Sequence, residues 1–225
     1  MWKRVELVKD PRLETLCRQL TSILDLEYLV EEIPLDFDIC GMQIVYRGDE
    51  PVLRIGIRRG SIDRLRELYP YVDVVEGCIE DRFDAYVRVS RMLCKEVRRV
   101  LSKYLFEDRE YALHILDDCR IVTMEGFRDH VPMPIPSRMV IFSAHTHPAG
   151  FALPSRNDLR VFLSIVSEGG LGIAIVSRTS TLCMYRKAPL SPEDYELICD
   201  WINRFEDYDL LTVSKKLSTV AIEFV

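Results

Sequence analysis

Two histidines and one aspartate in a short stretch of this sequence have the types and the spacing of metal ligands. His145 and His147 stand two positions apart, directly after an apolar run at residues 139–144. Residues two apart on a β-strand point to the same side, so both imidazoles can reach one ion at about 2.0–2.1 Å. Pro148 ends the strand, and Asp158 follows in the first turn of an expected helix. Its carboxylate can therefore swing back toward the strand end.

Three protein ligands predict a particular chemistry. They leave the fourth position of a tetrahedral zinc site for water, which is typical of a catalytic zinc site. Such a metal lowers the pKa of a bound water to about 7, which makes a nucleophile at neutral pH. The pattern thus predicts a zinc-dependent hydrolase. A structural interpretation competes with it, because Ser155-x-x-Asp158 also fits a helix cap with Ser155 as the N-cap residue.

The complete pattern resembles the signature of a known family. His145-x-His147-Pro148, a six-residue spacer and Ser155-x-x-Asp158 resemble the motif of the JAMM metallopeptidases, also called MPN+ or JAB. That family includes the deubiquitinating subunits of the proteasome lid and the signalosome, archaeal relatives and bacterial RadC proteins. The resemblance implies that His145, His147 and Asp158 bind Zn²⁺ and that Ser155 stabilises the oxyanion. It also implies an upstream glutamate that acts as general base.

Glu110 is the expected general base. It directly precedes residues 111–116, an expected strand, and it follows a long expected helix. Helix, glutamate, strand, strand and histidine-bearing strand is the order found in the family. Glu125, at the far end of the second strand, and Glu107, in the preceding loop, stay open as alternatives. His114 has even spacing from Glu110, and we interpret it as a satisfied, partly buried histidine because three ligands are already assigned.

The resemblance also implies a substrate. Members of the family cleave peptide or isopeptide bonds at the C-terminus of ubiquitin-like or sulfur-carrier proteins. Two alternatives are a catalytically silent scaffold or binding subunit with the same fold, and a RadC-like protein. RadC has a helix before its metal-binding strand, whereas Pro132, Pro134 and Pro136 exclude a helix interior there, which favours the archaeal type. A homo-oligomer is left open.

The surrounding pattern predicts an α/β chain of the α+β kind, in two domains. Residues 1–80 are expected to form a small α+β domain of unknown role. Residues 81–225 are expected to form the JAMM/MPN-like domain, a mixed β-sheet flanked by helices, and the resemblance covers about residues 82–205. The expected helices are 10–32, 61–68, 81–105, 155–167 and 191–205, and the expected strands are 42–46, 52–57, 72–75, 111–116, 120–124, 139–144, 171–176 and 181–185.

The composition argues against a membrane protein, a secreted protein and a nucleic-acid-binding protein. The 225 residues are 48% hydrophobic, which is enough for a buried core. No apolar run approaches the roughly 20 residues that cross a bilayer, and the first residues lack a secretory apolar segment, so we expect a cytoplasmic protein without a membrane partner. The net charge of −6 argues against nucleic acid as a partner.

Two further features of the composition concern the environment of the protein. Its seven cysteines include no C-x-x-C pair, which predicts free, buried thiols in a reducing compartment. Asparagine and glutamine are rare, whereas 29% of the residues are charged. This combination is typical of a thermophile.

Overall fold

The computed structural model of this chain describes residues 5–32, 38–47, 50–68, 70, 72–79, 82–128, 139–148 and 150–225. The chain groups into two compact units. Met1–Thr15 and Ser90–Val225 form the first unit, and Leu16–Val89 form the second. Both units combine helices with a sheet, so the predicted α+β class is confirmed. The expected domain boundary near residue 80 stays a prediction.

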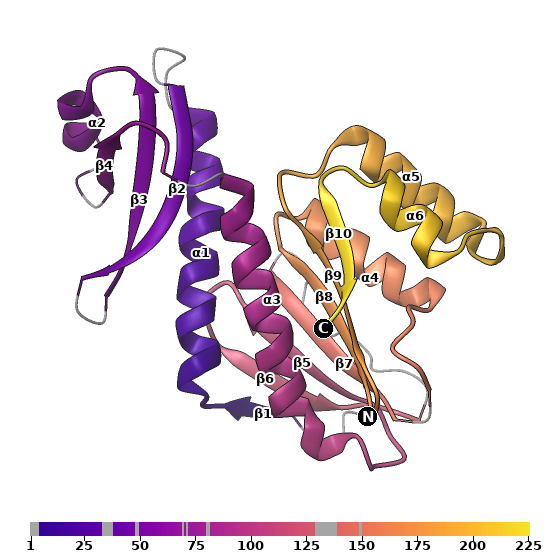
Figure 1. Ribbon diagram of the computed structural model, residues 1–225. Helices are drawn as coiled ribbons and strands as arrows, with labels where there is room; N and C mark the ends of the chain where they lie inside the picture. Colours follow the sequence, from indigo (N-terminus) through magenta and orange to yellow (C-terminus); the bar gives the residue numbers. More distant parts are fainter. Residues whose placement is uncertain are drawn as a thin grey trace. The chain divides into compact units, whose positions relative to one another are not determined.

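A seven-stranded mixed sheet forms the centre of the first unit (Figure 1). Its strand order is β1-β6-β5-β7-β8-β9-β10. The pair β7 and β8 is parallel, and the other neighbouring strands are antiparallel. The strands are β1 (Val5–Val8), β5 (Tyr111–Leu116), β6 (Ile121–Glu125), β7 (Val140–His147), β8 (Gly172–Ser177), β9 (Thr181–Arg186) and β10 (Val220–Phe224).

Helices cover both faces of this sheet. Cys183 of β9 is bonded to Cys94 of α3 (Arg82–Leu101), whereas its neighbours Leu182 and Met184 belong to the apolar core that contains α4 and α5. Neighbouring residues of a strand point to opposite faces, so α3 and the pair α4 and α5 lie on opposite sides. The helices that follow β7 are α4 (Arg156–Ser167), α5 (Pro192–Asn203) and α6 (Leu210–Lys216). Every residue of β8 and β9 is buried as a result.

The core between the sheet and its later helices consists of aliphatic and aromatic side chains. Phe162 of α4 is fully buried, and Trp201 of α5 is 2% exposed. They pack with Ile173 and Ile175 of β8 in one cluster. The apolar residues of α4 and α5 recur at helical spacing, which explains why the sequence predicted both helices. The core holds α4 against β8 and against β7, the strand that carries His145 and His147.

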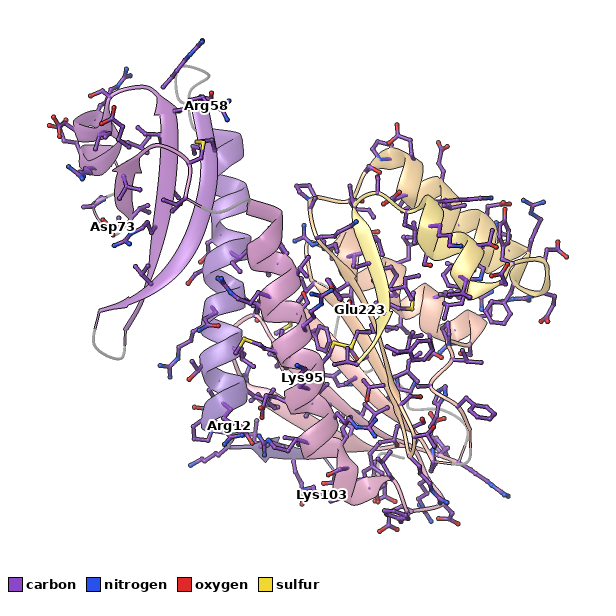
Figure 2. All side chains as sticks on the ribbon, in the orientation of Figure 1. Arg12, Arg58, Asp73, Lys95, Lys103 and Glu223 are labelled. Carbon is purple, nitrogen blue, oxygen red and sulfur yellow. A yellow bond between two sulfur atoms is a disulfide. The ribbon has the colours of Figure 1, made fainter. Side chains whose placement is uncertain are left out.

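A carboxylate links the edge strand β10 to α3 and β9. Glu223, labelled in Figure 2, accepts three guanidinium hydrogen bonds from Arg91, at 2.9, 2.9 and 3.1 Å, and a hydroxyl hydrogen bond from Tyr185 at 2.6 Å. Burial raises the pKa of Glu223, but the bonds from Arg91 and Tyr185 outweigh burial and lower it. The carboxylate therefore stays ionised and fixes the last strand of the sheet.

The second unit contains a three-stranded sheet of order β2-β3-β4. Strands β2 (Asp38–Arg47) and β3 (Glu50–Arg59) form an antiparallel hairpin. Helix α2 (Ile62–Leu68) then connects β3 to the parallel strand β4 (Asp73–Glu76). Most of the long helix α1 (Pro11–Glu32) belongs to this unit.

The predicted elements are confirmed with small shifts of their ends, but two strands and one α-helix among the described residues were missed. The helix expected at 81–105 ends at Leu101 and continues as a 3-10 turn, η1 (Ser102–Tyr104). Strand β1, strand β10 and helix α6 were not predicted. Strand β1 pairs with β6, so the first described residues complete the large sheet. No helix in the described part of the chain is long and apolar enough to span a membrane.

The prediction of free thiols is wrong for at least four cysteines. Disulfides join Cys40 to Cys78 in the second unit and Cys94 to Cys183 in the first, whereas Cys199 is free. The partners lie 38 and 89 residues apart in sequence, so packing and not local spacing brings them together. Disulfides persist in oxidising compartments and also in intracellular proteins of hyperthermophiles, so the cysteines no longer indicate a reducing compartment.

Removal of the Cys94–Cys183 disulfide is expected to destabilise the first unit. This bond closes a long loop, so Cys94→Ala with Cys183→Ala should lower the free energy of unfolding by about 2–4 kcal/mol. Denaturant titration measures the change, and the difference between variant and wild type should disappear in reductant, which opens the Cys94–Cys183 bond in the wild type too. Cys199→Ala is the control that removes a free thiol. Alkylation of Cys94 or Cys183 in unfolded, unreduced protein would contradict the assignment.

Candidate metal centre

Strand β7 carries the two histidines at its C-terminal end. The first five residues of β7, Val140–Ala144, are buried, and the strand ends at His147. His145 and His147 share a face because they stand two apart, and their side chains are 14% and 18% exposed. Their Nε2 atoms lie 3.1 Å from each other. The imidazoles therefore converge on one point, as the spacing predicted.

Asp158 reaches the same point from helix α4. The parallel pair β7 and β8 requires a crossover, and α4 supplies it, so the helix begins near the end of β7. Ser155 is the N-cap residue: its Oγ accepts the Asp158 N–H at 3.2 Å, and Asp158 Oδ2 accepts the Ser155 N–H at 2.7 Å. This capping box leaves Oδ1 of Asp158 3.1 Å from His145 Nε2. The structural and the metal-binding interpretations of Ser155-x-x-Asp158 are thus compatible.

The three side chains form a group that could hold a metal ion. Their ligand atoms all lie within 4.8 Å of one another. Two ligands of a tetrahedral Zn²⁺ ion at 2.0–2.1 Å are about 3.4 Å apart, from the geometry of the tetrahedron. The two 3.1 Å separations from His145 Nε2 come close to that edge, whereas His147 Nε2 lies 3.8 Å from Asp158 Oδ2. Two nitrogens and one carboxylate are a donor set that suits such an ion.

A hydrogen bond sets the tautomer of His147. Its Nδ1 lies 3.2 Å from the backbone carbonyl oxygen of Phe151, which can only accept. A neutral imidazole that donates from Nδ1 has its lone pair on Nε2, and that atom faces His145. This is the arrangement by which a backbone carbonyl orients a metal-binding histidine.

The charges of the cluster favour a positive charge close to the two imidazoles. Burial lowers the pKa of His145, but the hydrogen bond and charge of Asp158, together with the Glu110 charge, outweigh it and raise the pKa. Burial and the charge of His145 lower the pKa of His147. Burial raises the pKa of Asp158, but the hydrogen bonds from His145 and Ser155 lower it below the ordinary range. The ionised carboxylate and the Nε2 lone pair of His147 thus favour a proton on His145 or a metal ion in its place.

Glu110 lies beside this group. It is the residue before β5, and its carboxylate Oε1 is 3.9 Å from His147 Nε2. The side chain is 10% exposed. Its backbone N–H donates to Phe127 O at 2.8 Å, and its carbonyl accepts from Gly126 N at 2.8 Å. The Glu110 carboxylate therefore lies next to the three potential ligands.

The two alternative glutamates lie elsewhere. Glu125 pairs with Tyr111 across the sheet, while Ala112 pairs with His145, so Glu125 points to the opposite face from the histidines. Its carboxylate binds Arg109 at 2.8 Å. Glu107 is exposed in the loop before β5. The geometry favours Glu110 over both.

His114 is buried next to the cluster and satisfied on one side only. It is 3% exposed, and its Nδ1 lies 3.0 Å from the Ser143 hydroxyl. Its Nε2 has no hydrogen-bond partner within the described ranges. Burial and the charge of His145 lower the pKa of His114 to about 4, so the ring is neutral at neutral pH. The expectation of a satisfied, partly buried histidine is thus confirmed for Nδ1 only, because the ring is almost fully buried and its Nε2 is unsatisfied among the described residues.

Two contributors to the site were missed from sequence. The carbonyl of Phe151 orients His147, and the Thr146 hydroxyl accepts the backbone N–H of Tyr111 at 2.9 Å. A backbone carbonyl leaves no signal in the sequence. The threonine stands inside the motif, and the strand alternation alone indicates that it faces away from the histidines. Pro132, Pro134 and Pro136 lie outside the described residues.

Removal of a ligand should abolish metal binding without unfolding the chain. His145→Ala and Asp158→Asn are expected to lower the affinity for Zn²⁺ by at least about 10²-fold, because each leaves two protein ligands. Calorimetric titration measures the affinity. Ser155→Ala is the matched control: it weakens the cap by about 1 kcal/mol but keeps all three ligands, so metal binding should persist. Full affinity in His145→Ala would remove that residue from the site.

Metal affinity should fall as the pH falls. The pKa of His145 is raised, so below that pKa an imidazolium fills the site and one proton leaves for each ion bound. Above it the ring is neutral, and the affinity levels off. Competition against a chelator of known protonation between about pH 5 and 8 measures the slope. An affinity that stays constant through this range would contradict the exchange of a proton for the ion.

Comparisons with protein-family models, with curated proteins and with solved structures give no match. The resemblance to the JAMM family therefore stays a prediction that rests on the motif in the sequence. The convergence of His145, His147 and Asp158 stands by itself: these three residues form a group that could hold a metal ion.

Proposed function

We propose that this chain is a zinc-dependent peptidase of the JAMM type. It hydrolyses a peptide or isopeptide bond at the C-terminus of a ubiquitin-like or sulfur-carrier protein. One observation carries the proposal: His145, His147 and Asp158 converge, and the Glu110 carboxylate lies 3.9 Å from His147 Nε2. Metal-assisted hydrolysis requires a set of metal ligands and, beside it, a separate carboxylate that does not bind the metal. The substrate class follows from the resemblance of the sequence motif to that of the JAMM family.

Zinc fits the donor set, because two imidazole nitrogens and a carboxylate are frequent ligands of catalytic zinc. When bound, Zn²⁺ supplies a Lewis acid for the carbonyl and lowers the pKa of a water. The capping box supports this assignment because it holds Asp158 in place before any ion arrives. The tautomer of His147 supports it as well, because the Nε2 lone pair is already directed inward.

Glu110 is the proton carrier of the proposed reaction. Its carboxylate accepts the proton of the attacking water while the water oxygen bonds to the carbonyl carbon. The carbon–nitrogen bond then breaks, and Glu110 returns the proton to the leaving amine. Burial of the side chain excludes bulk water, which would compete for the same proton. The glutamate is long enough to reach this water without being a ligand itself.

Ser155 can serve the oxyanion and the helix at once. A hydroxyl has two acceptor positions and one donor. Its Oγ accepts the backbone N–H of Asp158, and the hydroxyl hydrogen can still be donated. Ser155 is exposed and lies at the start of α4, where the helix dipole also favours negative charge. The developing oxyanion therefore meets a hydroxyl donor and a positive helix end.

Glu110→Gln should separate metal binding from catalysis. The substitution keeps the shape but cannot accept the proton, so zinc near one per chain is expected with activity lowered by about 10²–10⁴-fold. The substrates are linear fusions of ubiquitin-fold proteins ending in Gly-Gly, with the released reporter measured by mass. Glu125→Gln is the control, because that carboxylate lies on the opposite face and loses only a partly exposed ion pair.

The outcomes separate the alternatives. Full activity in Glu110→Gln would exclude this residue as the base. Zinc bound by the wild type with no cleavage across the panel of fusions would contradict the peptidase proposal and favour a scaffold. Cleavage that persists after zinc is removed by a chelator would exclude a metal mechanism.

A further inference from the structure

Thr146 stands between the two histidines and faces away from them. Strand alternation directs its side chain to the opposite side of β7, so the hydroxyl cannot be a ligand of an ion held by His145 and His147. The residue is fully buried. Its Oγ1 accepts the backbone N–H of Tyr111 at 2.9 Å. A side chain of the histidine strand thus holds the first residue of β5.

This bond acts on the residue next to Glu110. The backbone of Glu110 is held from the other side, since its N–H donates to Phe127 O and its carbonyl accepts from Gly126 N. The Tyr111 ring stacks on Tyr104 with a centroid separation of 4.0 Å and an angle of 9°. The peptide link that follows Glu110 therefore depends on a ring stack and on the Thr146 hydroxyl.

The acceptor in this bond is a side chain, and that makes the bond depend on residue type. Ladder bonds between backbones form with almost any residue, but the bond to the Tyr111 N–H requires an acceptor at position 146. Valine has the shape and strand preference of threonine and lacks the oxygen. An amide left without its acceptor in a half-buried position favours a shift of the backbone that would restore a bond.

We propose that Thr146 is a positioning residue that holds the Glu110 carboxylate at its distance from the metal ligands. One strand presents both imidazoles on one face and, on the other, the hydroxyl that fixes the start of β5. Strand β7 therefore determines the positions of both the Glu110 carboxylate and the two histidine ligands. This inference rests on the proposed function for its catalytic consequence, whereas the positioning itself is a geometric property of the chain.

The test compares Thr146→Val with Thr146→Ser and with Thr123→Val. Thr123 is a second buried threonine of the same sheet, 3% exposed, and controls for the loss of a buried hydroxyl. We expect Thr146→Val to lower kcat by about 10–10²-fold with KM little changed, because a displacement of a catalytic group by about 1 Å has effects of this size. Zinc content should stay equal to that of the wild type. Thr146→Ser should restore most of kcat, and Thr123→Val should resemble the wild type.

Two measurements do not depend on activity. Amide hydrogen exchange at Tyr111 should be faster in Thr146→Val than in the wild type and in Thr146→Ser, because the amide loses its acceptor. Crystal structures of the zinc-loaded wild type and variant should show the Glu110 carboxylate displaced relative to His147 Nε2. If Thr146→Val fails to fold, Thr146→Cys replaces it, because sulfur is a weak acceptor of similar size.

The results distinguish this inference from the proposed function. Unchanged kcat, or an unmoved carboxylate in Thr146→Val, would overturn the positioning role. Loss of zinc together with activity, without rescue by serine, would show that the residue only supports the fold. If the zinc-loaded wild type cleaves none of the fusions, the proposed peptidase fails, and the exchange rates with the carboxylate position still decide whether Thr146 places Glu110.

Discussion

The two carboxylate oxygens of Asp158 make two different interactions, and the site depends on both of them. Oδ2 closes the capping box with the Ser155 N–H, and Oδ1 faces His145 Nε2. A carboxylate that was free to rotate would lose conformational entropy when it bound an ion, whereas this one is already fixed by the helix start. The same bond satisfies an amide of the first turn and aims a ligand. The stability of α4 and the arrangement of the cluster are therefore coupled.

Sheet topology explains why the cluster forms at this place. The parallel pair β7 and β8 requires the crossover helix α4, and its N-terminus then lies beside the end of β7. The antiparallel neighbour β5 begins at that same end, which brings Glu110 next to His147. Three elements meet at one edge, and each contributes a different chemical group: imidazoles, a carboxylate in the capping box and a second carboxylate. The packed core under α4 keeps them in register.

The sequence predicted most of this arrangement where the signal was local. The alternation at His145 and His147 and the cap at Ser155 follow from spacing, and the amphipathic helices follow from their apolar residues. The predictions failed for short elements and for long-range contacts. Strand β1 has four residues, which are too few for a clear alternation. Cys94 and Cys183 meet only after α3 has packed on β9. The choice between Glu110 and Glu125 required the register of β5 with both β6 and β7, and β7 pairs with β5 only in the assembled sheet. The bond from Tyr111 to Thr146 likewise exists only in the assembled sheet.

Strand β1 has a consequence for how the chain reaches this structure. Val5 pairs with Met124, more than a hundred residues later, so β1 has no partner strand until β6 has been synthesised. Contacts between residues so far apart in sequence slow folding, because a long loop must close before the strand pairing can stabilise the chain. Strands β5 and β6 form a local hairpin that is independent of this step. We therefore expect the sheet around His145 and His147 to form first on the β5–β6 hairpin. The edge strand β1 is expected to join the sheet late.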